Sequence, residues 1–195
     1  MNLKIKDISM ITLLSTVFTG IGAMIFSEKS LTADPLAKSK KSFYSIKMRD
    51  IDGKGIDLEA YRDKKIMIVN VASKCGFTNQ YADLQELYES HNGKLEIIGV
   101  PCNDFGKQEP GTLTEIKDFC VTNYGVSFLI TEKQKIKSSP VSDLYQWLSD
   151  PNLNGWNSTL PSWNFCKYII NEDGELTHFF RSGVNPNSEE IKNIL

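Results

Sequence analysis

The pattern of apolar and polar positions divides most of the chain into alternating strands and helices. Two continuous apolar runs, residues 66–71 and 95–100, have the length of buried strands, and the segment between them repeats apolar residues at helical spacing until Gly93. A strand, a helix and a second strand in this order predict parallel pairing with a right-handed crossover. Polar residues follow both strands, so we expect a site at the carboxyl edge of the sheet.

The rest of the chain adds elements on both sides of this unit. Alternation over residues 43–48, followed by a glycine turn, predicts an N-terminal β-hairpin. Thr112 and Glu115 form a capping-box pattern that opens a helix ending at Gly125. The remaining predictions are a strand near 126–130, a helix from Ser139-Pro140 to 148, strands at 166–170 and 176–180, and a helix at 188–195. This order predicts an α/β protein with a thioredoxin-like fold, a central mixed β-sheet flanked by helices, over residues 42–195.

Residues 1–41 have a different character. Lys4 and Lys6 precede a nearly continuous apolar stretch at 8–26, and a polar linker follows it. We interpret residues 1–41 as an N-terminal signal or anchor segment with its linker, because about 19 apolar residues lie between a signal-peptide core and a minimal membrane span. The expectation is an exported protein, periplasmic, secreted or membrane-anchored through residues 8–26, with organelle targeting left open.

Charge excludes one class of partner. The chain carries a net charge of -2, and residues 42–195 alone hold 16 Lys and Arg against 21 Asp and Glu. A mildly acidic domain lacks the basic surface that nucleic acid requires, so we expect no nucleic-acid partner.

Cys75 is the first candidate for chemistry. It lies in the turn between the buried strand 66–71 and the helix that follows, where unpaired backbone N–H groups and the adjacent Lys74 favour a thiolate. A lone cysteine is more often a small buried apolar residue, but the polar neighbours of Cys75 argue against that interpretation. Thr78 stands where a CxxC motif would have its second cysteine, which excludes local dithiol chemistry.

Three segments resemble the signature blocks of the glutathione peroxidase family. They are residues 70–76 (NVASKCG), 101–111 (PCNDFGKQEPG) and 163–165 (WNF), and the resemblance covers about residues 42–195. It implies a peroxidatic Cys75, with Gln108, Trp163 and Asn164 completing a catalytic tetrad and no cofactor or metal. Neutral amide and indole N–H donors suit this role, because they stabilise a thiolate and a developing alkoxide without forming an ion pair.

Cys120 resembles the resolving cysteine of the cysteine-dependent, thioredoxin-using branch of that family. Its spacing from Leu113 and Ile116 also places it on the apolar face of its helix, where packing alone would explain it. A disulfide requires Cα atoms within about 7 Å, so a buried resolving cysteine requires its helix to loosen. We therefore expect the reduced protein to hold Cys75 and Cys120 apart, and we interpret Cys102 and Cys166 as structural.

The resemblance implies a thiol peroxidase that reduces hydrogen peroxide and organic or lipid hydroperoxides. Its reductant would be a thioredoxin-like protein rather than glutathione, and the absence of a long insertion at 128–148 resembles the monomeric members. A peroxide sensor that passes a disulfide to a partner remains the alternative. Metal binding is disfavoured, because His91 and His178 lie far from the cysteines in sequence and no CxxC spacing exists. Asp104 and Ser162 depart from the usual residues of the family.

Overall fold

The computed structural model describes residues 30–91 and 93–195. The apolar segment 8–26, with its expected signal or anchor role, lies outside them. Within these two described ranges, no helix is long and apolar enough to cross a membrane.

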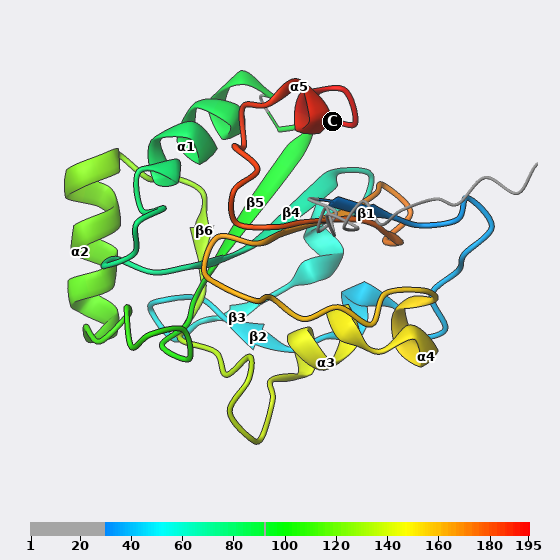
Figure 1. Cartoon of the computed structure of the whole chain (residues 1–195), viewed down its shortest axis with the longest axis horizontal. Coiled ribbons are helices and arrows are strands. Elements are labelled where there is room, and N and C mark those ends of the chain that lie inside the picture. The colour runs from blue at the N-terminus through cyan, green and yellow to red at the C-terminus, as the bar shows by residue number, and fades with distance from the viewer. Residues whose placement is uncertain (1–29, 92) are drawn as a thin grey trace, which may run out of the picture.

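A six-stranded mixed sheet forms the centre of the protein, in the order β1-β8-β7-β4-β5-β6 (Figure 1). β4 pairs in parallel with β5, and β5 with β6, whereas β7, β8 and β1 run antiparallel to their neighbours. The strands are β1 (Ser30–Thr32), β4 (Lys65–Val71), β5 (Leu95–Pro101), β6 (Leu129–Ile130), β7 (Lys167–Ile170) and β8 (Leu176–Phe180). The predicted parallel unit is confirmed, with α1 (Gln80–Ser90) as its crossover helix.

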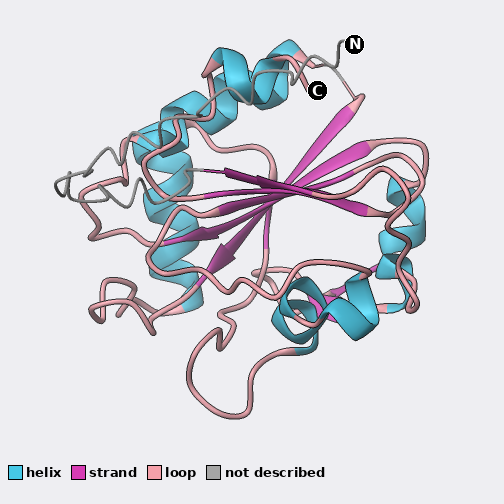
Figure 2. Cartoon of the chain, turned by 45° about the vertical axis from the view of Figure 1, so that its right-hand side comes forward, coloured by secondary structure: helices cyan, strands magenta, loops and turns pink. Residues whose placement is uncertain are grey.

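The sheet separates two apolar layers, and Figure 2 shows helices on both sides of the sheet. Alternation along β4 sends Ile66 and Ile68 into one layer and Met67 and Val69 into the other. The first layer lies under α3 (Asp143–Ser149), α4 (Pro151–Asn154) and two 3-10 turns, η1 (Phe43–Ser45) and η2 (Leu58–Tyr61). The second lies under α1, α2 (Leu113–Tyr124) and α5 (Glu189–Lys192).

The N-terminal hairpin is shorter than predicted. Residues 43–45 form η1 instead of a strand, because Phe43 and Tyr44 are both buried and a half-buried strand would expose one of them. The Phe43 ring packs against Trp147 of α3, with 5.4 Å between centroids. The hairpin that remains is a separate two-stranded sheet of β2 (Met48–Arg49) and β3 (Gly55–Ile56).

Several other boundaries differ from the sequence prediction, among them that of the last helix, which shortens to α5. The linker contributes an edge strand, β1, whose register pairs Ser30 with Phe180. α3 begins at Asp143 rather than near Pro140, because the Asp104 carboxylate accepts the backbone N–H groups of residues 136–138 and holds that segment as a loop. The predicted strand at 126–130 narrows to β6.

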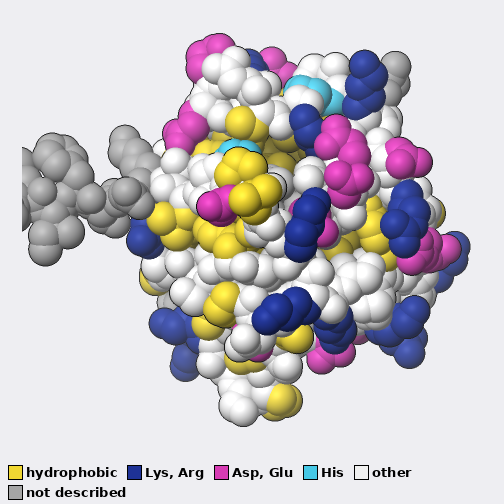
Figure 3. Space-filling model, turned by 90° about the vertical axis from the view of Figure 1, so that its right-hand side faces the viewer, with side chains coloured by type: hydrophobic (Ala, Val, Ile, Leu, Met, Phe, Trp, Pro, Cys, Tyr) yellow, Lys and Arg dark blue, Asp and Glu magenta, His cyan; other side chains and the backbone are white. Residues whose placement is uncertain are grey.

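Figure 3 shows the face on the side of β1, where acidic and basic side chains are intermixed around small apolar areas. The site residues lie elsewhere, beyond the carboxyl ends of β4 and β5.

Candidate active site

The turn that carries Cys75 is held by the side chain of Thr78. The Thr78 hydroxyl oxygen accepts the Cys75 N–H at 3.0 Å and lies 2.9 Å from the carbonyl oxygen of Ala72, to which it can donate. The Cys75 sulfur accepts the N–H of Phe77 at 3.4 Å, and Cys75 is half-buried. The residue that excludes a CxxC motif therefore organises the turn around the single thiol.

Gln108 and Asn164 are in direct contact, although 56 residues separate them. The Asn164 Nδ2 group donates to Gln108 Oε1 at 3.0 Å, and Asn164 is fully buried. Because the Gln108 oxygen is engaged, its amide NH₂ group is the part available to a reacting sulfur or oxygen. Lys74 joins this pair to the Cys75 turn, since its N–H donates to the Gln108 carbonyl at 3.0 Å.

Trp163 covers the same loop with its indole ring, and the residue as a whole is 38 % exposed. The ring meets Phe105 edge to face, and a Cβ atom added to Gly106 would lie 3.1 Å from it. Gly106 has a φ of +63°, a conformation that disfavours other residues, so the close approach and the turn both depend on glycine.

Asn70, at the end of β4, fixes the segment that presents Trp163 and Asn164. Its Nδ2 group donates to the Trp163 carbonyl at 2.9 Å, and its backbone carbonyl accepts the Phe165 N–H at 2.6 Å. Phe165 has a φ of +63°, and Lys107, just before Gln108, has a φ of +55°. Left-handed backbone at non-glycine residues costs of order 1–3 kcal/mol and persists where surrounding contacts impose it. The surrounding contacts therefore fix the backbone next to both Gln108 and Asn164.

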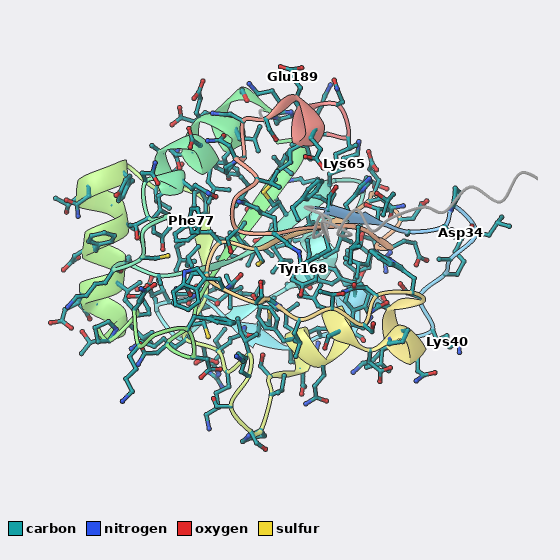
Figure 4. The ribbon with its side chains drawn as sticks, in the orientation of Figure 1. Asp34, Lys40, Lys65, Phe77, Tyr168 and Glu189 are labelled. Atoms are coloured by element: carbon teal, nitrogen blue, oxygen red, sulfur yellow. The ribbon has the colours of Figure 1, made fainter. Side chains whose placement is uncertain are left out.

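The sheet divides the four cysteines into two pairs. Cys75 packs against the layer that contains Cys120, whereas Cys102 and Cys166 are buried in the opposite layer. All four are free thiols. Cys120 therefore shares an apolar layer with Cys75, and Figure 4 shows Phe77 of the Cys75 turn on the side of α1 and α2.

Burial makes two of these thiols weak acids. It raises the pKa of Cys102 to about 12 and that of Cys120 to about 11, although the Tyr81 hydroxyl lowers the pKa of Cys120 in part. Cys102 and Cys166 are both 0 % exposed, as expected of structural cysteines.

Sequence reasoning missed Glu109, which directly follows Gln108. Glu109 is fully buried and its Oε2 atom accepts the Ser73 N–H at 2.9 Å, so the carboxyl group lies beneath the Cys75 turn. Burial raises the pKa of this carboxyl group. The sequence carried no signal for this burial, because a carboxylate in a polar loop before a Pro-Gly turn is typical of an exposed residue.

Comparison with known proteins decides the family. The model of the glutathione peroxidase family matches residues 43–149, more than half of the chain. The chain belongs to the glutathione peroxidase family. A glutathione peroxidase-like peroxiredoxin 2 of Saccharomyces cerevisiae is 39 % identical over 157 residues, 79 % of this chain and 97 % of that protein. The glutathione peroxidase homolog BsaA of Bacillus subtilis is 40 % identical over 150 residues, 76 % of this chain and 94 % of the relative.

Solved structures agree with the fold. The crystal structure of Trgpx in apo form has a TM-score of 0.62 at 31 % identity, covering 80 % of this chain and 94 % of the other. A thioredoxin-like protein from Aeropyrum pernix, at 16 % identity and a TM-score of 0.54, covers 79 % of this chain and 89 % of its own, and shares the fold alone. The predicted thioredoxin-like fold is confirmed, and the chain is a peroxidase of the glutathione peroxidase family.

Proposed function

We propose that Cys75 is the peroxidatic residue of a thiol peroxidase. The Cys75 thiolate attacks one oxygen of a hydroperoxide, the O–O bond breaks, and the other oxygen leaves as an alkoxide or hydroxide that takes up a proton. Gln108, Trp163 and Asn164 supply neutral N–H donors for the sulfur and the leaving oxygen. The contact between Gln108 and Asn164 supports this role, because it orients one amide by means of the other.

The sulfenic acid left on Cys75 requires a second thiol before it oxidises further. We assign this role to Cys120, which attacks the sulfenic sulfur to give a disulfide and water. The observation that carries the assignment is the division of the cysteines by the sheet, because Cys120 packs in the layer of Cys75 while Cys102 and Cys166 pack in the other. Cys120 is buried within α2, so this helix has to open around it.

The proposed reductant is a thioredoxin-type protein rather than glutathione. Relatives of this chain in Saccharomyces cerevisiae and Candida albicans carry the name peroxiredoxin, which supports a cysteine-based cycle. Hydrogen peroxide and organic or lipid hydroperoxides are the proposed substrates, and the proposed state is a monomer. We further propose export, with residues 8–26 as a signal or anchor; fractionation and mapping of the native N-terminus test that part.

Peroxide consumption by the purified protein, with thioredoxin or glutathione as reductant, tests the function. Cys75→Ser should abolish turnover, and Cys120→Ser should retain the first oxidation of Cys75 but lose the disulfide and the thioredoxin-dependent cycle. Cys102→Ser is the matched control, since it removes a buried thiol from the other layer. Full turnover by the Cys120→Ser protein would refute the assignment of the resolving cysteine, and turnover by Cys75→Ser would refute the proposed chemistry.

A further inference from the structure

A pocket of about 410 Å³ separates the Cys75 turn from α2. Ser73 and Lys74 line it from the Cys75 turn, Ile116 and Phe119 line it from α2, and Glu109 lines it from the loop after β5. Cys120 directly follows Phe119 in the chain. A movement that joins Cys120 to Cys75 therefore involves the two walls of this pocket.

Glu109 places a fully buried carboxylate next to that pocket. Its side chain is 0 % exposed, one carboxylate oxygen accepts the Ser73 N–H, and the other, Oε1, has no hydrogen-bond partner among the described residues. The backbone is fixed as well, because Asn103 accepts the Glu109 N–H at 2.9 Å and Lys133 donates to the Glu109 carbonyl at 3.1 Å. A buried acceptor without a full partner is unfavourable, and the Ser73 side chain, Lys133 and Lys74 compensate in part by lowering the pKa of this carboxyl group.

The Cys120 thiol, whose pKa burial and the nearby Glu109 raise, has the opposite requirement, since it has to lose a proton. Cys120 is 1 % exposed, and burial raises its pKa to about 11. Opening of α2 removes this burial, but even an exposed cysteine, with a pKa of about 8.5, is mostly a thiol at pH 7. Because the thiolate is the nucleophile, the attack of Cys120 on a sulfenic acid needs a base.

We propose that Glu109 transfers the proton in the step that joins Cys120 to the oxidised Cys75, an inference that rests on the proposed function. The Glu109 carboxylate accepts the proton of the Cys120 S–H group as the new S–S bond forms. The S–O bond of the Cys75 sulfenic acid breaks, and the leaving hydroxide takes that proton from the Glu109 carboxyl group and departs as water. Cys120 is oxidised, the Cys75 sulfur is reduced, and Glu109 returns to its carboxylate form.

The charges around Glu109 define the pH dependence of this step. The facing groups are Lys74 and Lys133, which favour its carboxylate, Tyr81 from α1, and Glu115 and Cys120 from α2. With an internal base, the rate of disulfide formation rises with pH only until Glu109 has lost its proton, and is then level. Without one, the rate follows the thiolate fraction of Cys120 in the opened helix and rises about tenfold per pH unit up to the pKa of an exposed cysteine, about 8.5.

Glu109→Gln is the decisive variant, because the amide oxygen still accepts the Ser73 N–H but the side chain can no longer accept a proton in this way. One equivalent of hydrogen peroxide is mixed with the reduced full-length protein, and acid-quenched samples are analysed by mass for sulfenic acid and disulfide. We expect disulfide formation at pH 7 to slow about 100-fold relative to the oxidation of Cys75, as for loss of a general base. Glu115→Gln removes a carboxylate from the same pocket and should keep the wild-type ratio of the two rates.

The pH profiles separate the remaining outcomes. A Glu109→Gln protein that forms the disulfide at the wild-type rate, with a level profile, would overturn the inference. If that variant does not fold, the wild-type profile decides, since a tenfold rise per unit through neutral pH would exclude an internal base. Failure of the proposed function gives a different result. If Cys120 is not the resolving cysteine, the Cys120→Ser protein still forms a disulfide between Cys75 and another thiol.

Discussion

Lys167 provides the sharpest test of how burial controls ionisation in this protein. Its side chain is 0 % exposed in β7, and its Nζ atom donates to three neutral oxygens, Gln80 Oε1 and the Val184 carbonyl at 2.5 Å and the Ser182 carbonyl at 3.5 Å. Burial lowers the pKa of this amine to about 7. The perturbation is Lys167→Met, which keeps an unbranched side chain and removes the ionisable group.

The direction in which pH changes the stability follows from the protons that Lys167 binds in the folded and unfolded states. An unfolded lysine has a pKa of about 10.4, so between pH 7 and 10 the unfolded chain binds a proton at Lys167 that the folded protein lacks. The wild-type protein therefore gains stability as the pH rises through this interval. A difference of roughly 3 pKa units corresponds to about 4 kcal/mol. The Lys167→Met protein lacks this pH-dependent contribution to stability. It also leaves Gln80 Oε1 and the Val184 carbonyl unpaired, a loss of about 1–3 kcal/mol each that does not change with pH.

The assay is urea unfolding of both proteins at pH 7, 8, 9 and 10 under reducing conditions. The gap in free energy of unfolding between wild type and Lys167→Met should widen by about 4 kcal/mol from pH 7 to pH 10. Cysteines and tyrosines titrate in both proteins, so their contributions cancel in the difference. Lys192→Met, at an exposed lysine of α5, is the control and should give a constant gap. A constant gap for Lys167→Met as well would show that burial does not lower the pKa of Lys167 in the folded protein.

Three further predictions concern the site and its supporting loop. Gly106→Ala should lower stability by about 1 kcal/mol and slow peroxide oxidation of the thiol, because the residue has positive φ and the new Cβ meets Trp163; stopped-flow rates equal to wild type would count against this. Thr78→Val should lose about 1–3 kcal/mol in urea unfolding, since the Cys75 N–H loses its acceptor, and Thr78→Ser should restore most of it. Hydrogen bonds lower the pKa of Asp104 to about 2, so its carboxylate stabilises the fold above that pH. The wild type should therefore lose its greater stability over Asp104→Asn as the pH falls from 4 to 2, and parallel acid-unfolding curves of the two proteins would contradict this.

The central unit of the fold could be predicted from the sequence because its signals are local. β4 and β5 are continuous apolar runs, and α2 begins at Thr112 with a capping box and ends at Gly125 in the left-handed conformation, as its sequence indicates. The residues of η1 gave a local signal for the wrong element, an alternation typical of a strand, and those of β1 gave none. Their conformations depend on packing against Trp147 and pairing with β8, partners more than 100 residues away.

The site shows the same division between local and distant information. Cys75, Gln108, Trp163 and Asn164 could be proposed because each lies in a recognisable block. The blocks do not reveal that Asn164 donates to Gln108, or that Thr78 closes the Cys75 turn. Glu109 could not be distinguished from an exposed loop acid, because its burial results from the packing of the loop beneath Ser73.

The proposed chemistry sets a requirement on α2 whose free energy can be weighed against its contacts. To reach Cys75, Cys120 has to leave the apolar layer, and the Val126 N–H, which donates to the Cys120 carbonyl at 3.2 Å, loses its partner. The capping box at Thr112 lies two turns away and can persist while the carboxyl-terminal part of the helix opens. The Gly125 N–H also loses its bonds to the Cys120 and Val121 carbonyls, so these hydrogen bonds and one small buried side chain represent about 3–5 kcal/mol, within the range of local openings that occur in folded proteins. A reduced state that holds the two thiols apart, as expected from the sequence, would therefore be compatible with a resolving step that needs no global unfolding.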